Sequence, residues 1–307
     1  MIIKRIVSFL PSATELLYEF GEQEKIFGVT HECKYPNDAK KKPQVINSSI
    51  NSDMLTSKEI NDQTCKLLSE GKEIFLLNEE NLRKADPDLI ITQETCEVCA
   101  AHTNQVSKAI QILQKRPQIH SMDPHNLEEI ILSVTKLGEI LQREDKAKEI
   151  TSSLKKRIQK ICDIKNEKGI KVLAIEWIEP FFTAGHWVPE MIEKAGGQNM
   201  ISKTGETSRK LSIEEIIESD PDIIIMMPCG FDVDRTVSEY NKILKNQKEW
   251  KMLKAVRNNM VFGVDANSFF SKPSIRTITG LEILAKIIQP KKTSDVSVPE
   301  NSFLQFK

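Results

Sequence analysis

The residues best suited to bind a metal lie in the segment Thr92–His102. There Cys96 and Cys99 are separated by two residues, and His102 follows three residues later. Two thiolates and an imidazole at this spacing can offer three ligands to a soft metal ion. At the start of a helix, the helix dipole would also stabilise the thiolates. A second Cys-x-x-Cys pair, which completes the usual zinc signature, is absent from the sequence. The segment therefore predicts contact with a ligand; it is either a metal site or a loop with two partly buried thiols.

Two further histidines follow predicted strands. His31 lies in the sequence His31-Glu32-Cys33, and His186 lies between Gly185 and Trp187. An imidazole in such a loop can coordinate a transition metal or hydrogen-bond a polar ligand edge. The alternative is a histidine that hydrogen-bonds only its own loop. Both alternatives remain open for His186, and His31 is a second candidate for ligand contact.

Large aromatic side chains occur near predicted loops of the second half of the chain. A flat, mostly apolar ligand is bound by aromatic faces together with a few polar groups. We expect at least two of these side chains to face a cleft, whereas burial as loop anchors is the alternative. The candidates are Trp177, Phe181, Trp187, Phe231 and Phe269.

The segment Ser12-Ala13-Thr14-Glu15 opens a predicted helix. Free backbone N–H groups at a helix N-terminus can bind an anionic or amide oxygen. Glu15 stands three residues after Ser12, which is the spacing of a capping box. We favour the cap, and ligand contact through the backbone of Ser12 and Ala13 is a secondary prediction.

The chain contains the same helix–turn–strand pattern twice, and these elements help to position the candidate residues. Residues 85–91 read Ala-Asp-Pro-Asp-Leu-Ile-Ile, and residues 219–225 read Ser-Asp-Pro-Asp-Ile-Ile-Ile. A helix ends before the proline, and the β-branched run that follows is typical of a buried parallel strand. The repeat predicts two α/β lobes of similar, Rossmann-like design, whose ligands would bind at the carboxyl ends of the strands.

A long stretch between the predicted lobes lacks proline and contains one glycine, Gly138. Its apolar residues recur at helical spacing, which predicts one long helix or two in tandem. We therefore expect an N-terminal lobe at 1–122, a linker helix at 123–165, a C-terminal lobe at 166–290 and a C-terminal extension at 291–307.

The charge and hydropathy of the chain limit its possible partners. The formal net charge is -1, so no broad basic surface is expected, and nucleic acid is not a predicted partner. No apolar run approaches the roughly 20 residues that span a bilayer. The apolar run Ile6–Leu10 stops at Pro11 and is too short for a secretory signal. These features predict a cytoplasmic protein, or an extracytoplasmic one if a leader has been removed.

Several segments together resemble the cobalamin and iron-complex substrate-binding proteins of ABC transporters. The resemblance is closest to the cobalamin-binding branch. It is carried, in order, by the segments Arg5–Glu15, Gly28–Pro36, Leu82–Thr92, Phe182–Pro189, Gly196–Asn199, Leu211–Ile225 and Asp265–Arg276.

The resemblance implies a class III periplasmic-binding-protein-like fold, with two α/β lobes of parallel sheets joined by a long rigid linker helix. It also implies a corrinoid such as cobalamin as ligand, or a related metal complex, packed against aromatic side chains. An ABC transporter permease would be the partner. Family members dock through acidic residues on each lobe. Glu97 stands near the first such position, but the second, Ser268–Lys272, contains no acid. A corrinoid carrier that does not dock to a transporter is therefore an alternative.

These candidates form two expected sets, one for ligand binding and one for metal binding, and no catalytic residue is expected. The ligand-binding set is Ser12, Ala13, His31, Glu94, Cys96, Glu97, Trp177, Phe181, His186, Trp187, Phe231 and Phe269, and the metal-binding set is Cys96, Cys99, His102 and His186.

Two other functions remain open. A tetrapyrrole metal chelatase would place His31, Glu94, Glu97 and His186 around its substrate, as enzymes with two α/β lobes can do. A metal-ion or thiol redox site would instead be centred on the Cys96–Cys99 loop.

Overall fold

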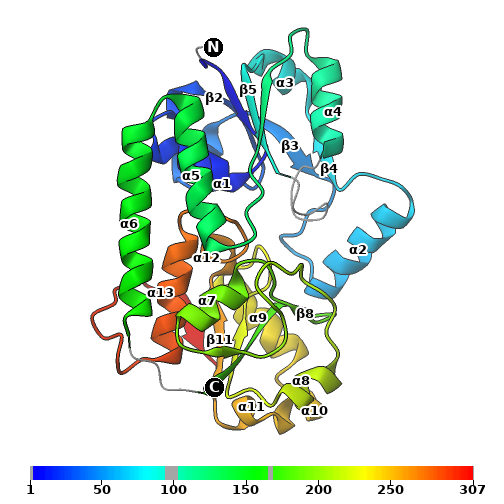
Figure 1. The fold of residues 1–307 in the computed structure, drawn as a ribbon. Coiled ribbons are helices and arrows are strands. Elements are labelled where there is room, and N and C mark those ends of the chain that lie inside the picture. Colours follow the sequence, from blue (N-terminus) through cyan, green and yellow to red (C-terminus); the bar gives the residue numbers. More distant parts are fainter. Residues whose placement is uncertain (1–2, 94–102, 165–168, 307) are drawn as a thin grey trace. The chain divides into compact units, whose positions relative to one another are not determined.

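The computed structural model describes residues 3–93, 103–164 and 169–306 (Figure 1). The chain forms two compact units, and each is built from more than one stretch of sequence. Unit 1 comprises Met1–Leu55, Asp62–Pro124 and Glu129–Thr151. Unit 2 comprises Thr56–Asn61, His125–Glu128 and Ser152–Lys307. The two α/β lobes expected from the sequence are confirmed.

Unit 1 contains a six-stranded sheet in the order β4-β3-β2-β1-β5-β6. All neighbouring strands pair in parallel except β3 and β4, which are antiparallel. The sheet is therefore mixed, with a parallel centre. The strands are β1 (Ile6–Ser8), β2 (Ile26–Thr30), β3 (Gln44–Ser48), β4 (Phe75–Leu77), β5 (Leu89–Thr92) and β6 (Gln118–Ser121).

The helical segments of the first half of the chain connect these strands. They are α1 (Pro11–Glu19), η1 (Gln23–Lys25), η2 (Asn37–Lys41), α2 (Ser57–Ser69), α3 (Glu79–Ala85) and α4 (Thr103–Ile112). One face of the sheet is packed by a cluster of buried apolar residues that includes Val7, Val45, Ile90 and Leu82. The first turn of α2 belongs to unit 2, although the rest of this helix belongs to unit 1.

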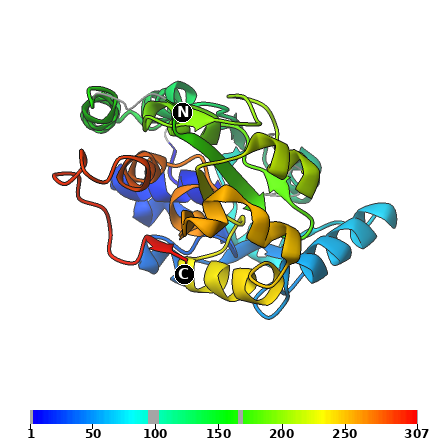
Figure 2. The same cartoon turned by 90° about the horizontal axis from the view of Figure 1, so that it is seen from below.

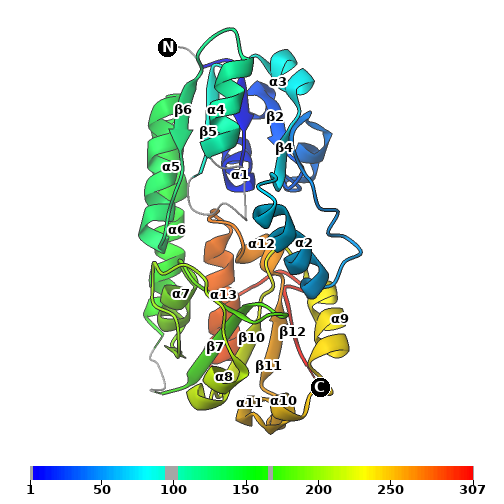
Figure 3. The same cartoon turned by 90° about the vertical axis from the view of Figure 1, so that its right-hand side faces the viewer.

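Unit 2 contains a sheet in the order β12-β11-β10-β7-β8, with β9 paired to β7 (Figure 3). Strands β9, β7, β10 and β11 pair in parallel, whereas β8 and β12 are antiparallel. The strands are β7 (Lys171–Trp177), β8 (Phe182–Thr183), β9 (Gln198–Asn199), β10 (Ile223–Met226), β11 (Val261–Val264) and β12 (Phe303–Gln305). The helices are α7 (Val188–Lys194), α8 (Ile213–Ser219), α9 (Val233–Ile243), α10 (Lys248–Met252), α11 (Lys254–Arg257), α12 (Ala266–Phe269) and α13 (Thr277–Ile288).

The repeated Asp-Pro-Asp sequence has the same structure in both units. The first aspartates, Asp86 and Asp220, end α3 and α8 with left-handed φ angles of 37° and 42°. Aspartate tolerates this conformation better than most residues, and the proline that follows prevents the helix from continuing. The polypeptide then enters β5 in unit 1 and β10 in unit 2.

The second aspartates of the repeat fasten the start of each unit's first strand. Asp88 Oδ2 accepts hydrogen bonds of 3.0 Å from Lys4 N and Arg5 N, and Asp88 Oδ1 lies 2.9 Å from Lys115 Nζ. In unit 2, Asp222 Oδ2 accepts from Lys171 N at 2.9 Å and Oδ1 lies 2.6 Å from Lys254 Nζ.

The same lysines explain the low pKa of each aspartate. The Lys115 hydrogen bond is the main reason why the pKa of the Asp88 carboxyl is below its usual value. Burial acts to raise the pKa of Asp222, but the hydrogen bonds from Lys254 and the Lys171 backbone outweigh it and lower the pKa.

The linker consists of two helices in tandem, α5 (Leu127–Leu141) and α6 (Glu144–Cys162). The break falls at Gln142, whose φ is 58°. A Cβ at Gly138 would lie 2.5 Å from Ala147 Cβ, so this glycine permits the close approach of the two helices at the break. The division between the units falls after Thr151, inside α6.

The C-terminal segment ends in a sheet strand. Strand β12 pairs antiparallel with β11, and the red strand beside the C label in Figure 2 is this element. Phe306 is buried against Gly263, where an added Cβ would lie 2.6 Å from the phenyl ring. In the part of the chain that the structure describes, no helix is both apolar enough and long enough to cross a membrane.

Candidate functional site

Helix α1 starts at the carboxyl end of β1, two residues earlier than the expected cap at Ser12 implies. Leu10 is the N-cap and Pro11 is the first helical residue, and no side chain caps the helix. The capping box expected at Ser12 and Glu15 is therefore wrong, because Ser12 already lies inside the helix. Ser12 and Ala13 are buried, and Ser12 Oγ has no hydrogen-bond partner among the described residues.

His31 directly follows β2. Its backbone N donates to Ile46 O at 3.0 Å, which fixes the start of the loop to the neighbouring strand. The imidazole ring lies 6.0 Å from the Phe75 ring, and its Nε2 lies 3.5 Å from Glu32 Oε1. The side chain is half-buried, so it remains accessible to a ligand at this end of the sheet.

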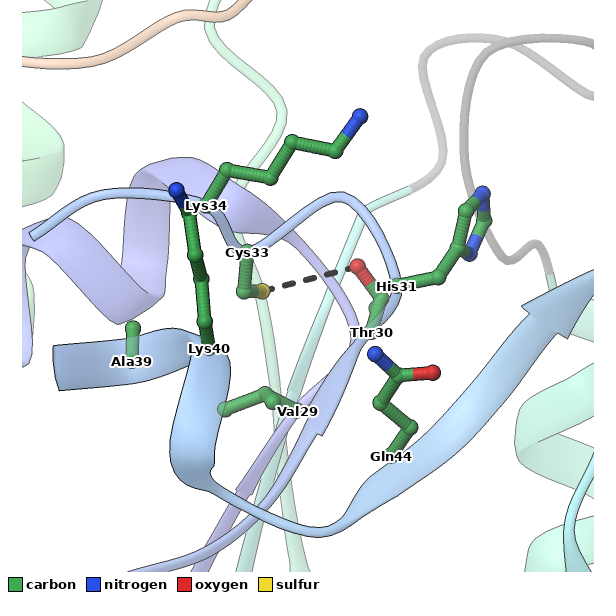
Figure 4. Close-up of a pocket in the computed structure, with 8 residues that line it drawn as sticks. All are labelled: Val29, Thr30, His31, Cys33, Lys34, Ala39, Lys40 and Gln44. Atoms are coloured by element: carbon green, nitrogen blue, oxygen red, sulfur yellow. Dashed lines mark hydrogen bonds between the residues drawn. The ribbon is translucent and has the colours of Figure 1, made fainter. Parts of the chain in front are cut away.

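A pocket of about 340 Å³ lies beside this loop in unit 1 (Figure 4). Its floor includes the buried thiol of Cys33, whose Sγ lies 3.1 Å from Thr14 Oγ1 and 3.4 Å from Thr30 Oγ1. The two hydroxyls satisfy the thiol, so Cys33 is a structural residue of the pocket. The lining residues are Val29, Thr30, His31, Cys33, Lys34, Ala39, Lys40 and Gln44.

In unit 2, His186 is held in a left-handed conformation with φ of 55°. Its backbone N donates to Glu206 O at 2.6 Å, and its backbone O accepts from Gly205 N at 2.8 Å. These two hydrogen bonds fix the backbone of His186 at both its N and its O. Its imidazole ring lies 5.9 Å from the ring of His125. No pattern in the sequence indicated this pair, because the two histidines lie far apart in the chain.

The residues around His186 make this loop rigid. A Cβ on Gly185 would lie 2.5 Å from Glu206 O and 2.8 Å from Ser208 N, so only glycine fits there. Glu176, at the carboxyl end of β7, accepts a 2.9 Å hydrogen bond from Ser208 Oγ and a 3.4 Å bond from Gly185 N. Glu176 was missed in the sequence because a single acid at a strand end carries no distinguishing pattern.

Three of the five expected aromatic contacts are buried. Trp187 is 5% exposed and its Nε1 donates to Phe270 O at 3.1 Å; Phe231 and Phe269 are 2% and 8% exposed. The guanidinium of Arg235 covers the Phe231 ring at 3.8 Å from its centroid. In this structure these three rings anchor their loops and present no open face.

The other two aromatic candidates are half-buried. Trp177 donates from Nε1 to Ser57 O at 3.1 Å, and its ring meets the Phe231 ring edge-on at 5.4 Å. Phe181 stacks on Trp250 at 5.8 Å with an interplanar angle of 17°. Both therefore have partners within unit 2 and retain part of their surface.

The candidates of the Cys96–Cys99 loop lie outside the described residues. These are Glu94, Cys96, Glu97, Cys99 and His102. Among the residues that the structure describes, no three or more His, Cys, Asp or Glu side chains group as a metal site. The described candidates thus form two separate sets: His31 with its pocket in unit 1, and His186 with His125 in unit 2.

Two α/β units with mixed sheets, linked through a pair of helices, define a class of solute-binding proteins. The chain belongs to the periplasmic binding protein family, whose model matches residues 6–268. The resemblance seen in the sequence is thereby confirmed. Members of this family are substrate-binding proteins of transporters and not enzymes, so the chelatase alternative does not apply. The metal-ion or thiol site at the Cys96–Cys99 loop lies outside the described residues and stays a prediction.

Two curated relatives illustrate the similarity. The chain is 24% identical over 295 residues to an uncharacterised ABC transporter substrate-binding lipoprotein, YvrC of Bacillus subtilis, covering 94% of this chain and 80% of the relative. It is 29% identical over 142 residues to the high-affinity heme uptake system protein IsdE of Staphylococcus aureus. That match covers 45% of this chain and 48% of IsdE, about half of either length.

Two solved structures have a similar fold. A possible iron-binding, periplasmic solute-binding protein from Staphylococcus epidermidis superposes with a TM-score of 0.69 at 26% identity, covering 94% of this chain and all of that one. The vitamin B12 binding protein BtuF of Vibrio cholerae gives a TM-score of 0.68 at 20% identity, with 94% and 97% of the two chains covered. The second likeness concerns the fold alone.

The cytoplasmic localisation expected from the N-terminal sequence is wrong. The family is one of periplasmic binding proteins, and the relative from Bacillus subtilis is a lipoprotein. The prediction failed because it depended on the short apolar run Ile6–Leu10 and on the lack of a longer one, which do not report the family to which the folded units belong.

Proposed function

We propose that this chain captures a metal tetrapyrrole, with a corrinoid such as cobalamin as the first candidate, and delivers it to an ABC transporter permease. The observation that carries the proposal is the conformation of His186. His186 is a non-glycine residue held at positive φ by hydrogen bonds to its own backbone N and O, and strained backbone of this kind clusters at functional sites.

The imidazole of His186 would serve as an axial ligand to the metal. A neutral imidazole nitrogen is a good ligand for cobalt and for iron. His125, whose ring lies 5.9 Å away, would orient the His186 ring, as partners of metal-bound histidines commonly do. His31 in unit 1 stays a candidate for ligand contact, and Trp177 and Phe181 are the aromatic candidates of unit 2 with accessible surface.

Haem is the second candidate ligand. The match to the haem uptake protein IsdE covers about half of this chain, and the similar protein from Staphylococcus epidermidis is described as possibly iron-binding. Haem and corrinoids share a flat ring of four nitrogens around a metal whose axial ligand can be exchanged, so an imidazole such as His186 suits both. The loop with Cys96, Cys99 and His102 remains a predicted contact with either ligand.

The test is a titration of the purified protein with aquocobalamin and, separately, with hemin, followed by visible absorption and tryptophan fluorescence. We expect saturation at one ligand per chain and a band shift that reports axial coordination. His186→Ala should abolish the shift and weaken binding by about tenfold or more, whereas His120→Ala, on β6 of unit 1, should bind as the wild type does. If neither compound binds, the ligand is wrong and the family assignment stands. If binding and band shift survive His186→Ala, the axial role is wrong.

A further inference from the structure

The pocket beside β2 has a chemical character that the axial-ligand proposal leaves unused. It is lined on one side by the ammonium-bearing chains of Lys34 and Lys40 and on the floor by Val29, Ala39 and the Cys33 thiol. In Figure 4, Lys40 and His31 lie on opposite sides of the Cys33 thiol, and Lys34 extends above it. The lining therefore combines an apolar floor with cationic groups on long, flexible chains.

The charges around the pocket favour an anion. Lys40 forms no ion pair with any described residue, and Lys34 is only loosely paired, since its Nζ lies 3.9 Å from Glu32 Oε1. The nearby acid Asp38 is already engaged, because its Oδ1 lies 2.8 Å from Lys41 Nζ. Glu32 also lies beside the pocket, and its Oε1 is 3.5 Å from His31 Nε2 as well as 3.9 Å from Lys34 Nζ.

The polar groups of the floor are already satisfied. Thr30 Oγ1 accepts a 3.1 Å hydrogen bond from Glu32 N and lies 3.4 Å from the Cys33 sulfur. Cys33 N donates to Thr30 O at 3.0 Å. A ligand group that enters the pocket consequently meets apolar surface below, with the lysines, His31 and the Gln44 amide as its polar partners.

The size of the pocket limits what can enter. A volume of about 340 Å³ is at the small end of ligand sites, so it admits a side arm of a large ring but not the ring itself. Because the pocket opens at the same strand end as His31, a ring held near His31 could extend an arm into it.

We propose that this pocket receives an aliphatic part of a side arm of the ligand together with the anionic group that the arm carries, a carboxylate or a phosphate. The aliphatic part contacts Val29 and Ala39, and the anion is bound by Lys34 and Lys40 with help from Gln44. The assignment of this anion as part of the ligand rests on the proposed function. The anion-binding chemistry itself rests only on the pocket.

The first experiment is independent of the large ligand. Isothermal titration of the full chain with inorganic phosphate at low ionic strength should show weak, saturable binding that disappears as salt screens the lysines. Lys34→Gln/Lys40→Gln should abolish it, and Gln44→Glu, which adds a negative charge to the lining without changing the side chain's size, should weaken it. The matched control is Lys4→Gln/Lys66→Gln, which removes the same charge at two exposed positions outside the pocket and should bind as the wild type does.

The second experiment identifies the source of the anion. Cobalamin carries a phosphate in its nucleotide arm and cobinamide lacks that arm; haem carries two carboxylates and its dimethyl ester carries none. Lys34→Gln/Lys40→Gln should weaken binding of cobalamin or haem by about tenfold, since hydrogen bonds to charged groups are among the stronger ones. The same variant should leave the affinity for cobinamide or for the diester unchanged.

The outcomes separate the two proposals. Equal losses with the anionic and anion-free ligands, or equal losses in the control variant, would overturn the pocket assignment while the proposed ligand class stands. If no tetrapyrrole binds, the proposed function fails and the phosphate titration decides the pocket. Saturable phosphate binding that is lost in Lys34→Gln/Lys40→Gln supports the pocket assignment. Absence of phosphate binding to the wild type overturns it.

Discussion

Trp177 donates a hydrogen bond from its indole Nε1 to the backbone oxygen of Ser57 at 3.1 Å, although 120 positions separate the two residues. The backbone N of Ser57 in turn donates to Glu239 Oε1 at 2.5 Å. Both Ser57 and Glu239 are buried. The first turn of α2 is therefore held in unit 2 by an indole on one side and a carboxylate on the other.

Loss of the Trp177 donor should destabilise unit 2. Trp177→Phe keeps an aromatic ring against Phe231 but leaves the buried Ser57 oxygen without this partner, at a cost of about 1–2 kcal/mol in the free energy of unfolding. Urea unfolding followed by circular dichroism measures it. Met252→Ala, at a side chain that is 67% exposed, should change the value by less than about 0.5 kcal/mol. An unchanged stability for Trp177→Phe would mean that water replaces the indole.

Glu239 should act together with Trp177. Glu239→Gln keeps the shape of the side chain but removes the negative charge from the N-terminus of α2, so we expect a loss of about 1 kcal/mol. Because both partners bind the same residue, the double variant should lose less than the sum of the two single losses. A double-mutant cycle in urea checks this. Strictly additive losses would show that Ser57 does not couple the two side chains.

The stability of unit 1 should depend on the ionisation of Glu22. Burial acts to raise the pKa of this carboxyl, but hydrogen bonds from Lys25 and Arg143 outweigh it and hold the pKa below its usual value. Arg143 Nε lies 2.6 Å from Glu22 Oε1, and the glutamate side chain is 1% exposed. The ion pair ties the end of α1 to the break between α5 and α6.

The sign of the pH effect follows from the lowered pKa. A carboxyl with a lower pKa in the folded state stabilises the fold above its unfolded pKa of about 4.3, and this contribution disappears as the pH falls through the folded value. Glu22→Gln should therefore cost about 2 kcal/mol at pH 7 and progressively less below about pH 4.5. Melting curves between pH 3 and 7 measure this. As a control, Glu80→Gln, which breaks an exposed ion pair with Lys84, should change the stability little at any pH in this range. A constant cost at every pH would assign the effect to packing.

Gly185 should be required for the His186 loop. Gly185→Ala would place a Cβ 2.5 Å from Glu206 O, which is too close, so the loop must move at a cost of about 1–3 kcal/mol. We expect a lower melting temperature and weaker tetrapyrrole binding together. Gly71→Ala, at φ of 65° with open space around it, should cost about 1 kcal/mol and leave ligand affinity unchanged. Normal affinity in Gly185→Ala would separate the loop from ligand binding.

The sequence predicted the elements of the fold well where local rules act. The Asp-Pro-Asp repeats indicated both helix ends and both strands, because a left-handed aspartate and a proline stop a helix whatever surrounds them. It did not predict that Asp88 and Asp222 each bind the start of another strand, since that contact depends on strand order, which a repeat does not encode.

The candidate site was harder to predict than the fold. The aromatic residues were expected to face a ligand from their place after strands, but Trp187 bonds Phe270 O and Phe231 is covered by Trp177 and Arg235. A position in the sequence indicates which end of a strand a side chain is near, but not whether neighbours cover it. His125 was missed for the same reason, because its approach to His186 is set by tertiary packing.

The anchoring of the first turn of α2 has a consequence for the growing chain on the ribosome. Ser57 is synthesised 120 residues before Trp177 and still longer before Glu239. At about 5–20 residues per second, the turn leaves the ribosome roughly 6–24 seconds before its indole partner exists. Throughout that interval Ser57 lacks its indole and carboxylate partners, so the final structure of α2 must wait for the second half of the protein.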